Sequence, residues 1–299
     1  MKTSLAFVLT LFAAASIWAQ VPSGNELPEA LKDIKQSSGM CWREDMAKPG
    51  KSSPSPAQDL RPDLSCGITP TELAGLHDRA DATLIDVRPL AERELFRIGG
   101  TLSMTASELR TKSVLRGKNL VLIGDGKAER ELYAACADLK ARGFARTRVL
   151  RGGMPSWLAH GGAVQGSAPD LLQSQRLSSS QLWGESQFDA NLVLMTVEQQ
   201  ALQGRLPFAL PVADASPAAV QSVIERRRKE LRNAPLAAVI LVTSTSTTDE
   251  VLKRLTQALR PVPLLVYTES AETYSRQFAQ LKATWEAQAK GPKRLRCGL

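Results

Sequence analysis

The residues best placed to do chemistry follow a short apolar run near the middle of the chain. Leu120–Ile123 has the composition of a buried parallel strand, and Gly124–Gly126 interrupts it. Leu132, Cys136 and Leu139 then recur at helical spacing and predict a helix that lies on a sheet. A strand that ends at glycine and continues as a helix directs backbone N–H groups and a positive helix end at the loop. This arrangement predicts a site for an anion or a reacting group.

The N-terminus has the features of an export signal. Lys2 supplies a positive charge, Leu5–Ile17 is apolar but too short to span a membrane comfortably, and Ile17–Ala19 is the expected cleavage site before Gln20. Residues 1–19 are therefore predicted to be a signal peptide. We expect the mature chain to be soluble and periplasmic or secreted.

The charge of the chain limits its partners. The formal net charge is +8, with basic clusters within 225–230 and 293–296. The first cluster is expected on a solvated helix face. Aromatic residues make up only 5% of the chain and do not alternate with basic ones, so nucleic acid is not an expected partner. We expect a protein partner whose identity the sequence does not reveal, and a weak contact of the basic tail, residues 291–299, with an anionic surface.

Four cysteines stand in a chain expected to meet an oxidising compartment. Cys136 lies on the apolar face of the helix described above and is interpreted as a buried, inert thiol. Cys41 and Cys66 form the simplest predicted disulfide, which would tie an N-terminal arm to the first domain. Cys297 is the alternative partner for either of them.

The first domain begins with a strong helix start. Residues 20–65 are rich in Pro, Ser, Gly and Lys and are expected to form an irregular arm. Thr69 as the N-cap, Pro70 at the first helical position and Glu72 three residues after the cap predict a helix. Residues 82–88 predict a strand that ends in a charged pair, Asp86 and Arg88, whose side chains share one side and can anchor nearby backbone.

Several motifs in this region, in order along the chain, resemble those of the rhodanese family. The motifs are Leu84–Arg88, Glu92, Ile98–Thr101, Arg142–Phe144, Val149–Trp157 and Gly161–Gly162. The resemblance implies an α/β domain over residues 66–164, with a parallel five-stranded sheet flanked by helices. It also implies sulfur-transfer chemistry at the loop between the fourth strand and its helix.

That loop departs from the family pattern. A working rhodanese needs a cysteine as the first loop residue, because its thiolate attacks the sulfur donor and the loop N–H groups then hold the anionic persulfide. Gly124 stands at this position. The degenerate loop continues with Asp125, Gly126, Lys127, Ala128, Glu129 and Arg130. We expect its carboxylates to take the place of a bound anion near the helix N-terminus. A phosphate cradle at Gly124–Lys127 would lack the Walker spacing.

The second half repeats the same plan more weakly. After a predicted linker, residues 165–187, strands and helices alternate through residues 188–290 in the order of a second, degenerate rhodanese-like α/β domain. Thr243 and Ser244 take the place of the cysteine and are interpreted as part of an N-capping turn. His77 and His160 are the only histidines, so neither a histidine base for these hydroxyls nor a His/Cys metal cluster is expected. The sequence predicts no metal and no cofactor.

The functional hypothesis that follows is an exported tandem rhodanese-like protein without catalytic cysteines, which acts as a binding or scaffold module. The alternative is an enzyme, a sulfurtransferase or thiol–disulfide protein that uses a non-loop cysteine such as Cys297. Arg294 and Arg296 would then lower the pKa of that thiol. A third hypothesis is an anion or lipid-surface binder that works through the tail.

Overall fold

The computed structural model describes residues 61–232 and 234–289. The signal peptide, Cys41, Cys297, the tail at 291–299 and most of the predicted arm lie outside the described residues. Within the described residues, no helix is long and apolar enough to cross a membrane.

The first half is built on a five-stranded parallel sheet with the strand order β1-β6-β5-β2-β4. The parallel sheet flanked by helices that the resemblance implied is therefore present. Its strands are β1 (Gly67–Ile68), β2 (Thr83–Asp86), β4 (Leu102–Ser103), β5 (Leu120–Ile123) and β6 (Thr147–Leu150). A separate antiparallel pair is formed by β3 (Phe96–Arg97) and β7 (Gln165–Gly166).

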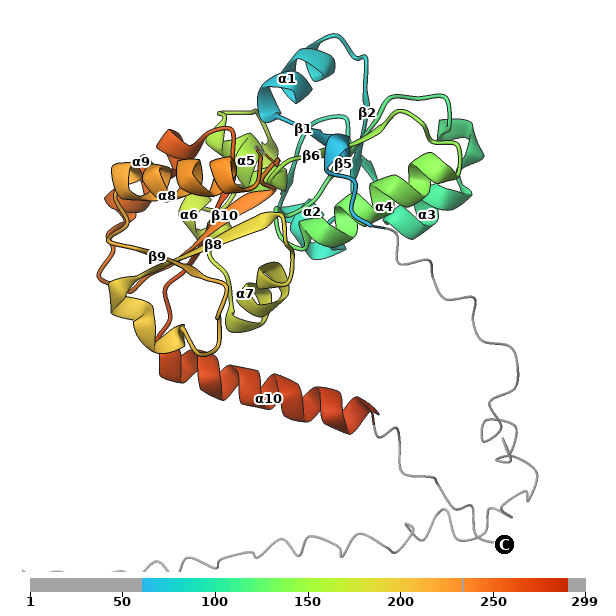
Figure 1. Ribbon diagram of the computed structural model, residues 1–299. Helices are drawn as coiled ribbons and strands as arrows, with labels where there is room; N and C mark the ends of the chain where they lie inside the picture. Colours follow the sequence, from blue (N-terminus) through green and yellow to red (C-terminus); the bar gives the residue numbers. More distant parts are fainter. Residues whose placement is uncertain (1–60, 233, 290–299) are drawn as a thin grey trace, which may run out of the picture. The chain divides into compact units, whose positions relative to one another are not determined.

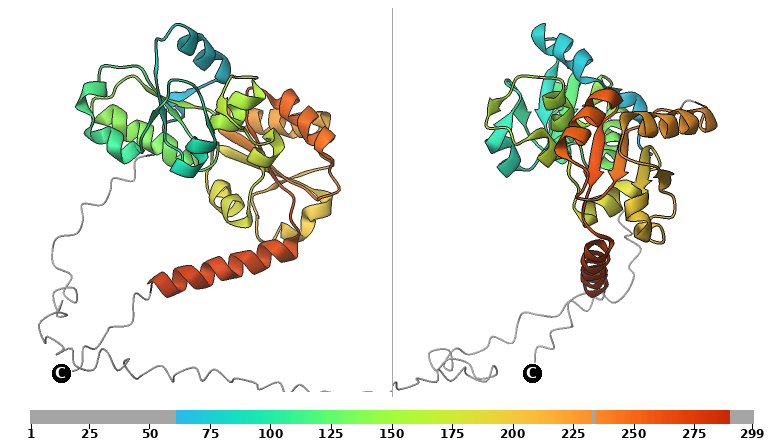
Figure 2. Two further views of the ribbon diagram at one scale, coloured as in Figure 1. Left: turned by 180° about the vertical axis from the view of Figure 1, so that it is seen from behind. Right: turned by 90° about the vertical axis from the view of Figure 1, so that its left-hand side faces the viewer.

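Helices cover both faces of this sheet (Figures 1 and 2). On one face, α3 (Ala106–Thr111) and α4 (Glu129–Ala141) pack their apolar side chains on the sheet, and on the other face α1 (Pro70–Asp78) and α5 (Gly153–Ala159) do so. Short elements complete this half: α2 (Leu90–Leu95), η3 (Leu64–Cys66) and η4 (Ser113–Leu115). Successive residues of β5 enter opposite clusters, as the two-residue period of a strand requires.

The helix start predicted at Thr69 is confirmed. The Thr69 hydroxyl accepts a hydrogen bond from the Glu72 N–H at 3.2 Å, and the Glu72 carboxylate accepts one from the Thr69 N–H at 2.7 Å. This capping box satisfies two of the N–H groups that a helix start leaves open. It fixes the entry of α1 beside β1.

The second half contains a four-stranded parallel sheet with the order β11-β10-β8-β9. Its strands are β8 (Asn191–Thr196), β9 (Leu210–Val212), β10 (Ala238–Val242) and β11 (Leu264–Tyr267). One face is covered by α6 (Leu171–Gln175), α8 (Pro217–Glu230) and α9 (Asp249–Leu259), and the other by α7 (Ser179–Ser186), η5 (Val197–Leu202) and α10 (Ala271–Ala289). Both faces of every central strand are buried, which explains the unbroken apolar runs in the sequence.

The segment predicted as a linker, residues 165–187, holds two helices, α6 and α7. Its leucines explain the difference: Leu172, Leu177 and Leu182 are buried in the two hydrophobic clusters of the second half. Ser178 and Gln181 also form a capping box at the start of α7. The polar residues of this stretch therefore lie between leucines that are buried in the hydrophobic core.

Candidate functional site

The loop singled out by the sequence, Gly124–Ala128, connects β5 to α4 at the carboxyl edge of the first sheet. It rests on the Gly152–Gly153 turn at the start of α5, where the Met154 N–H donates to the Gly124 carbonyl oxygen at 2.9 Å. A Cβ on Gly153 would lie 2.4 Å from the Gly124 oxygen, and Gly153 has a φ of +52°. Only glycine permits so close an approach with this backbone. The turn therefore sets the shape of the loop.

Three acidic side chains already occupy N–H groups in and beside this loop. Asp125 Oδ1 accepts a hydrogen bond from the Lys127 N–H at 2.9 Å. Glu185, which comes from α7, accepts one from the Ala128 N–H through Oε1. Glu129 Oε1 accepts one from the Gly152 N–H. The N–H groups of Lys127, Ala128 and Gly152 are thus paired with carboxyl groups of the chain itself and are not free to hold an external anion.

Glu129 is the most buried of these acids. It is 3% exposed, and its Oε2 has no hydrogen-bond partner. Burial raises its pKa to about 8, the hydrogen bond from the Gly152 N–H opposes that rise, and the nearby Glu185 adds to it. Glu129 is therefore mainly protonated at neutral pH, which lowers the cost of placing it in the core.

Glu185 is the residue that sequence reasoning missed. Burial raises the pKa of its carboxyl, and the hydrogen bonds from the Ala128 N–H and from Asn191 Nδ2 counteract that rise. Asn191 reaches Glu185 Oε2 at 2.9 Å and also donates to the Glu185 carbonyl oxygen at 3.0 Å. The only signal in the sequence was the capping box at the start of α7, which predicts a helix but not what its last turn contacts.

The remaining residues of the loop differ in their exposure to solvent. Gly124 and Gly126 are buried, Lys127 is half-buried, and Ala128 and Arg130 are exposed. Ala128 occupies the N-cap of α4 with a φ of +52° and makes no side-chain hydrogen bond to the helix. The structure therefore brings Asp125, Lys127 and Glu129 together and leaves Arg130 at the surface.

The predicted anchor beneath the site is confirmed. Arg88 Nε donates to Asp86 Oδ1 at 3.0 Å, and Arg88 Nη2 donates to Asp86 Oδ2 at 2.8 Å and to the Phe96 carbonyl oxygen at 2.7 Å. Both side chains are buried. This bidentate pair ties the end of β2 to the start of β3.

The predicted disulfide is wrong. Cys66 is bonded to Cys136, the residue interpreted from the sequence as an inert thiol. The helical pattern correctly placed Cys136 in the core of the first half, but it could not show that η3 carries Cys66 to the same spot, where the two Cα atoms lie 6.6 Å apart. Cys66 is therefore not the partner of Cys41 or Cys297.

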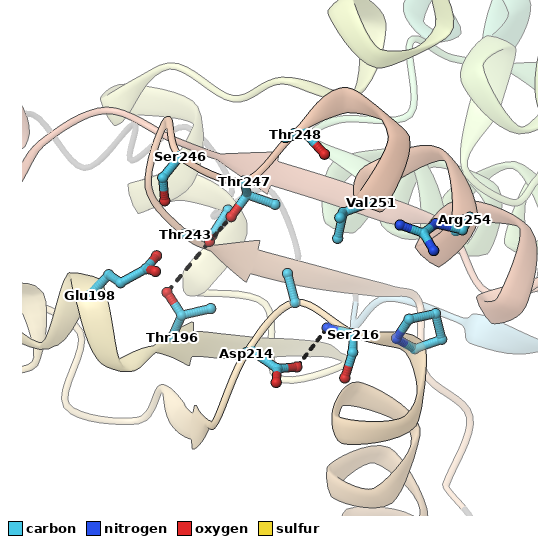
Figure 3. A pocket seen from close by; sticks show the side chains of 12 residues that line it. Thr196, Glu198, Asp214, Ser216, Thr243, Ser246, Thr247, Thr248, Val251 and Arg254 are labelled. Carbon is cyan, nitrogen blue, oxygen red and sulfur yellow. Dashed lines mark hydrogen bonds between the residues drawn. The ribbon is translucent and has the colours of Figure 1, made fainter.

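The second predicted loop begins at Thr243, directly after β10, and lines a cavity of about 330 Å³ (Figure 3). The buried Thr243 hydroxyl is 2.7 Å from the Thr247 hydroxyl, and the Ser244 hydroxyl donates to Glu198 Oε2 at 2.8 Å. Thr248 is the N-cap of α9 but makes no side-chain capping bond. The hydroxyl run therefore does not cap the helix as expected, and it shapes the wall of a cavity instead.

No metal site is found among the residues that the structure describes: no three His, Cys, Asp or Glu side chains are grouped to hold an ion.

Comparison with known proteins defines the class of the first half. Residues 69–160 match the family described as the rhodanese-like domain. Residues 69–160 therefore form a rhodanese-like domain, with Gly124 in its strand-to-helix loop. No curated protein matches the chain.

Similar solved structures include a rhodanese-like domain from Anabaena sp., 23% identical, which covers 34% of this chain and 79% of its own, with a TM-score of 0.30. A rhodanese-related protein from Thermoplasma volcanium is 26% identical over 33% of this chain and 96% of its own, with a TM-score of 0.29. A thiosulfate sulfurtransferase from Pseudomonas aeruginosa is 16% identical over 71% of this chain and 42% of its own, with a TM-score of 0.30.

Proposed function

We propose that the protein is a non-catalytic, exported rhodanese-like binding protein. The observation that carries this proposal is the contact between the Glu185 carboxylate and the Ala128 N–H, in a loop that begins with Gly124. The loop thus has neither a nucleophile nor a free N–H group at Ala128. Its role is to present a surface to a partner protein.

The chemistry of sulfur transfer explains why both features matter. A thiolate must attack the sulfur donor, and the resulting persulfide anion needs N–H donors or cations around it. Here the first loop residue has no side chain, and Asp125 and Glu185 place carboxylates on the donors. A second anion at this loop would meet like charge and would have to displace Glu185.

A second rhodanese-like domain in the other half is part of the proposal, and strand order supports it. The order β11-β10-β8-β9 repeats the order β6-β5-β2-β4, strand for strand along the chain. Arg176 makes an isolated parallel bridge to Val266 of β11, in the place where β1 pairs with β6. The residue after the central strand is Gly124 in one half and Thr243 in the other, so neither half has a cysteine there.

Export and partnership belong to the same proposal. The predicted signal peptide at 1–19 supports a periplasmic or secreted location. The partner is a protein, and the basic tail at 291–299 adds a weak attraction to anionic surfaces.

The proposal is tested by measuring turnover of thiosulfate and cyanide with the mature protein. We expect no turnover. A Gly124→Cys variant is compatible with the fold, because a Cβ at this position meets only the Leu132 Cδ2 atom, at 3.1 Å, and the Gly126 backbone N, at 3.9 Å. We expect this variant to remain inactive and the double variant Gly124→Cys with Glu185→Ala, which removes the acceptor from the Ala128 N–H, to gain activity.

A further experiment tests the alternative in which Cys297 is the nucleophile. Turnover in the natural chain that disappears in Cys297→Ser would overturn the proposal and identify a non-loop cysteine as the nucleophile. Crosslinking of the mature protein in the exporting compartment, followed by mass spectrometry, then identifies the partner.

A further inference from the structure

We propose that the cavity in the second half binds a small zwitterion, a molecule that carries one carboxylate and one ammonium group. The cavity of about 330 Å³ lies at the carboxyl ends of β8 and β10, beside the start of α9 (Figure 3). The inference concerns the second half alone and does not depend on the state of the Gly124 loop.

The position of the cavity in the sheet favours a ligand site. β8 and β10 are neighbours, but the chain continues from β10 to β11 on one side and from β8 to β9 on the other. The connections therefore diverge above these two strands and leave a crevice at their carboxyl ends, as in other open parallel sheets that bind ligands. Thr196 at the end of β8 and Thr243 after β10 form the buried wall of the crevice.

The walls offer hydrogen-bonding groups and little net charge. Three hydroxyl residues of the loop after Thr243, namely Ser246, Thr247 and Thr248, line the cavity. Val251 and Pro217 add apolar surface. Small-molecule sites in proteins combine apolar walls with a few such polar groups, in cavities that begin at about 300 Å³. The volume of the cavity therefore accommodates a compact small molecule.

Opposite charges stand at the two ends of the cavity. Figure 3 shows Arg254 at one end and Glu198 at the other, with Asp214 between them. Glu198 is held by the Ser244 hydroxyl, and Asp214 accepts the Ser216 N–H at 2.8 Å, so both carboxylates are oriented by the chain. Glu198, Asp214 and Arg254 are exposed, so the cavity is open to solvent at its charged ends. The ammonium group of the proposed ligand would pair with the two carboxylates.

A carboxylate fits the opposite end. Among the described residues, Arg254 is the one cation that lines the cavity, and its Nε donates to the Glu250 carbonyl oxygen at 3.4 Å. α9 begins nearby with no side-chain cap at Thr248, so the N–H groups of its first turn lack that partner. The acids of the first turn are engaged elsewhere: Asp249 pairs with Arg176 at 3.1 Å and Glu250 with Lys253 at 3.8 Å. A ligand with both charges therefore satisfies both ends at once, whereas a simple anion or cation satisfies one.

The test is isothermal titration of the mature protein with glycine, 4-aminobutyrate and 6-aminohexanoate, which separate the two charges by increasing distances. Butyrate and butylammonium are the singly charged comparisons. We expect one of the zwitterions to bind about tenfold more tightly than either comparison, the factor that one added charged contact supplies. Glu198→Gln and Arg254→Gln should each weaken that binding about tenfold.

Lys229→Gln is the matched control, because Lys229 is an exposed cation on α8 that does not line the cavity. It should leave the affinity within about twofold of the natural chain. Ser246→Trp fills the cavity without changing its charge and should abolish binding. Equal affinity for butyrate and 4-aminobutyrate, binding that Glu198→Gln leaves intact, or no binding by any of the three zwitterions would each overturn the proposal.

Discussion

Glu185 in the last turn of α7 accepts a hydrogen bond from the backbone N–H of Ala128, the residue at which α4 begins. The two residues are 57 positions apart in sequence. A carboxylate of the chain therefore occupies an N–H donor at the N-terminal end of α4. This contact links the loop of the first half to the helix that precedes the second sheet.

Removing that carboxylate should destabilise the fold. Glu185→Ala leaves the Ala128 N–H without its acceptor and removes one of the two acceptors of Asn191 Nδ2, so we expect a loss of about 2–3 kcal/mol in the free energy of unfolding. Urea denaturation measures the loss. The control is Glu131→Ala, because Glu131 is exposed on the first turn of α4. Equal stability of the two variants would show that the Glu185 contact contributes nothing.

Glu129 should make stability depend on pH. Its pKa is raised from 4.5 to about 8 in the folded chain, so the native state keeps a proton that the unfolded state has released between these values. Stability therefore falls as the pH rises from about 4.5 to about 8. We expect Glu129→Gln, which stays neutral and retains an acceptor for the Gly152 N–H, to flatten this slope and to exceed the natural chain in stability at pH 8.

The measurement is a series of urea denaturations from pH 5 to pH 9, with Glu131→Gln as the control for an exposed glutamate. The slope does not vanish entirely in Glu129→Gln, because the pKa of Glu185 is raised as well. Parallel curves for the natural chain and Glu129→Gln would contradict the raised pKa.

Local signals in the sequence predicted the elements of the first half. The Thr69 capping box and the apolar run Leu120–Ile123 lie where expected, because both depend on residues close together in the chain. The contacts of Glu185 and the partner of Cys136 join distant segments, and no local pattern records which segments meet. The strand, the glycine break, the helix and the use of Asp125 as an acceptor in the loop were therefore predictable from the sequence, whereas the contact of Glu185 was not.

The Cys66–Cys136 bond should stabilise the fold substantially. It spans a sequence separation of 70 residues, and closing a loop of this length stabilises by about 4 kcal/mol in the chain-entropy model. Replacing both cysteines with serine should lower the unfolding free energy by an amount of this order. Peptide mapping without reduction should recover the Cys66 and Cys136 peptides joined.

A mapped link between Cys41 and Cys66, or an unfolding free energy of the double variant equal to that of the natural chain, would contradict the bond between Cys66 and Cys136.

Gly153→Ala should lower the free energy of unfolding, because Gly153 belongs to the turn that supports the Gly124–Ala128 loop. The new Cβ would lie 2.4 Å from both the Gly124 carbonyl oxygen and the Gly126 backbone nitrogen, at a residue whose φ is +52°. Both obstacles are backbone atoms, so the loop itself would have to shift, and we expect a loss of roughly 2–4 kcal/mol in the free energy of unfolding. Gly117→Ala is the matched control, since no atom lies within 4 Å of its added Cβ. The measurement is thermal denaturation of both variants, and we expect the lower melting temperature for Gly153→Ala. Similar melting temperatures would mean that the Gly152–Gly153 turn does not hold the loop in place.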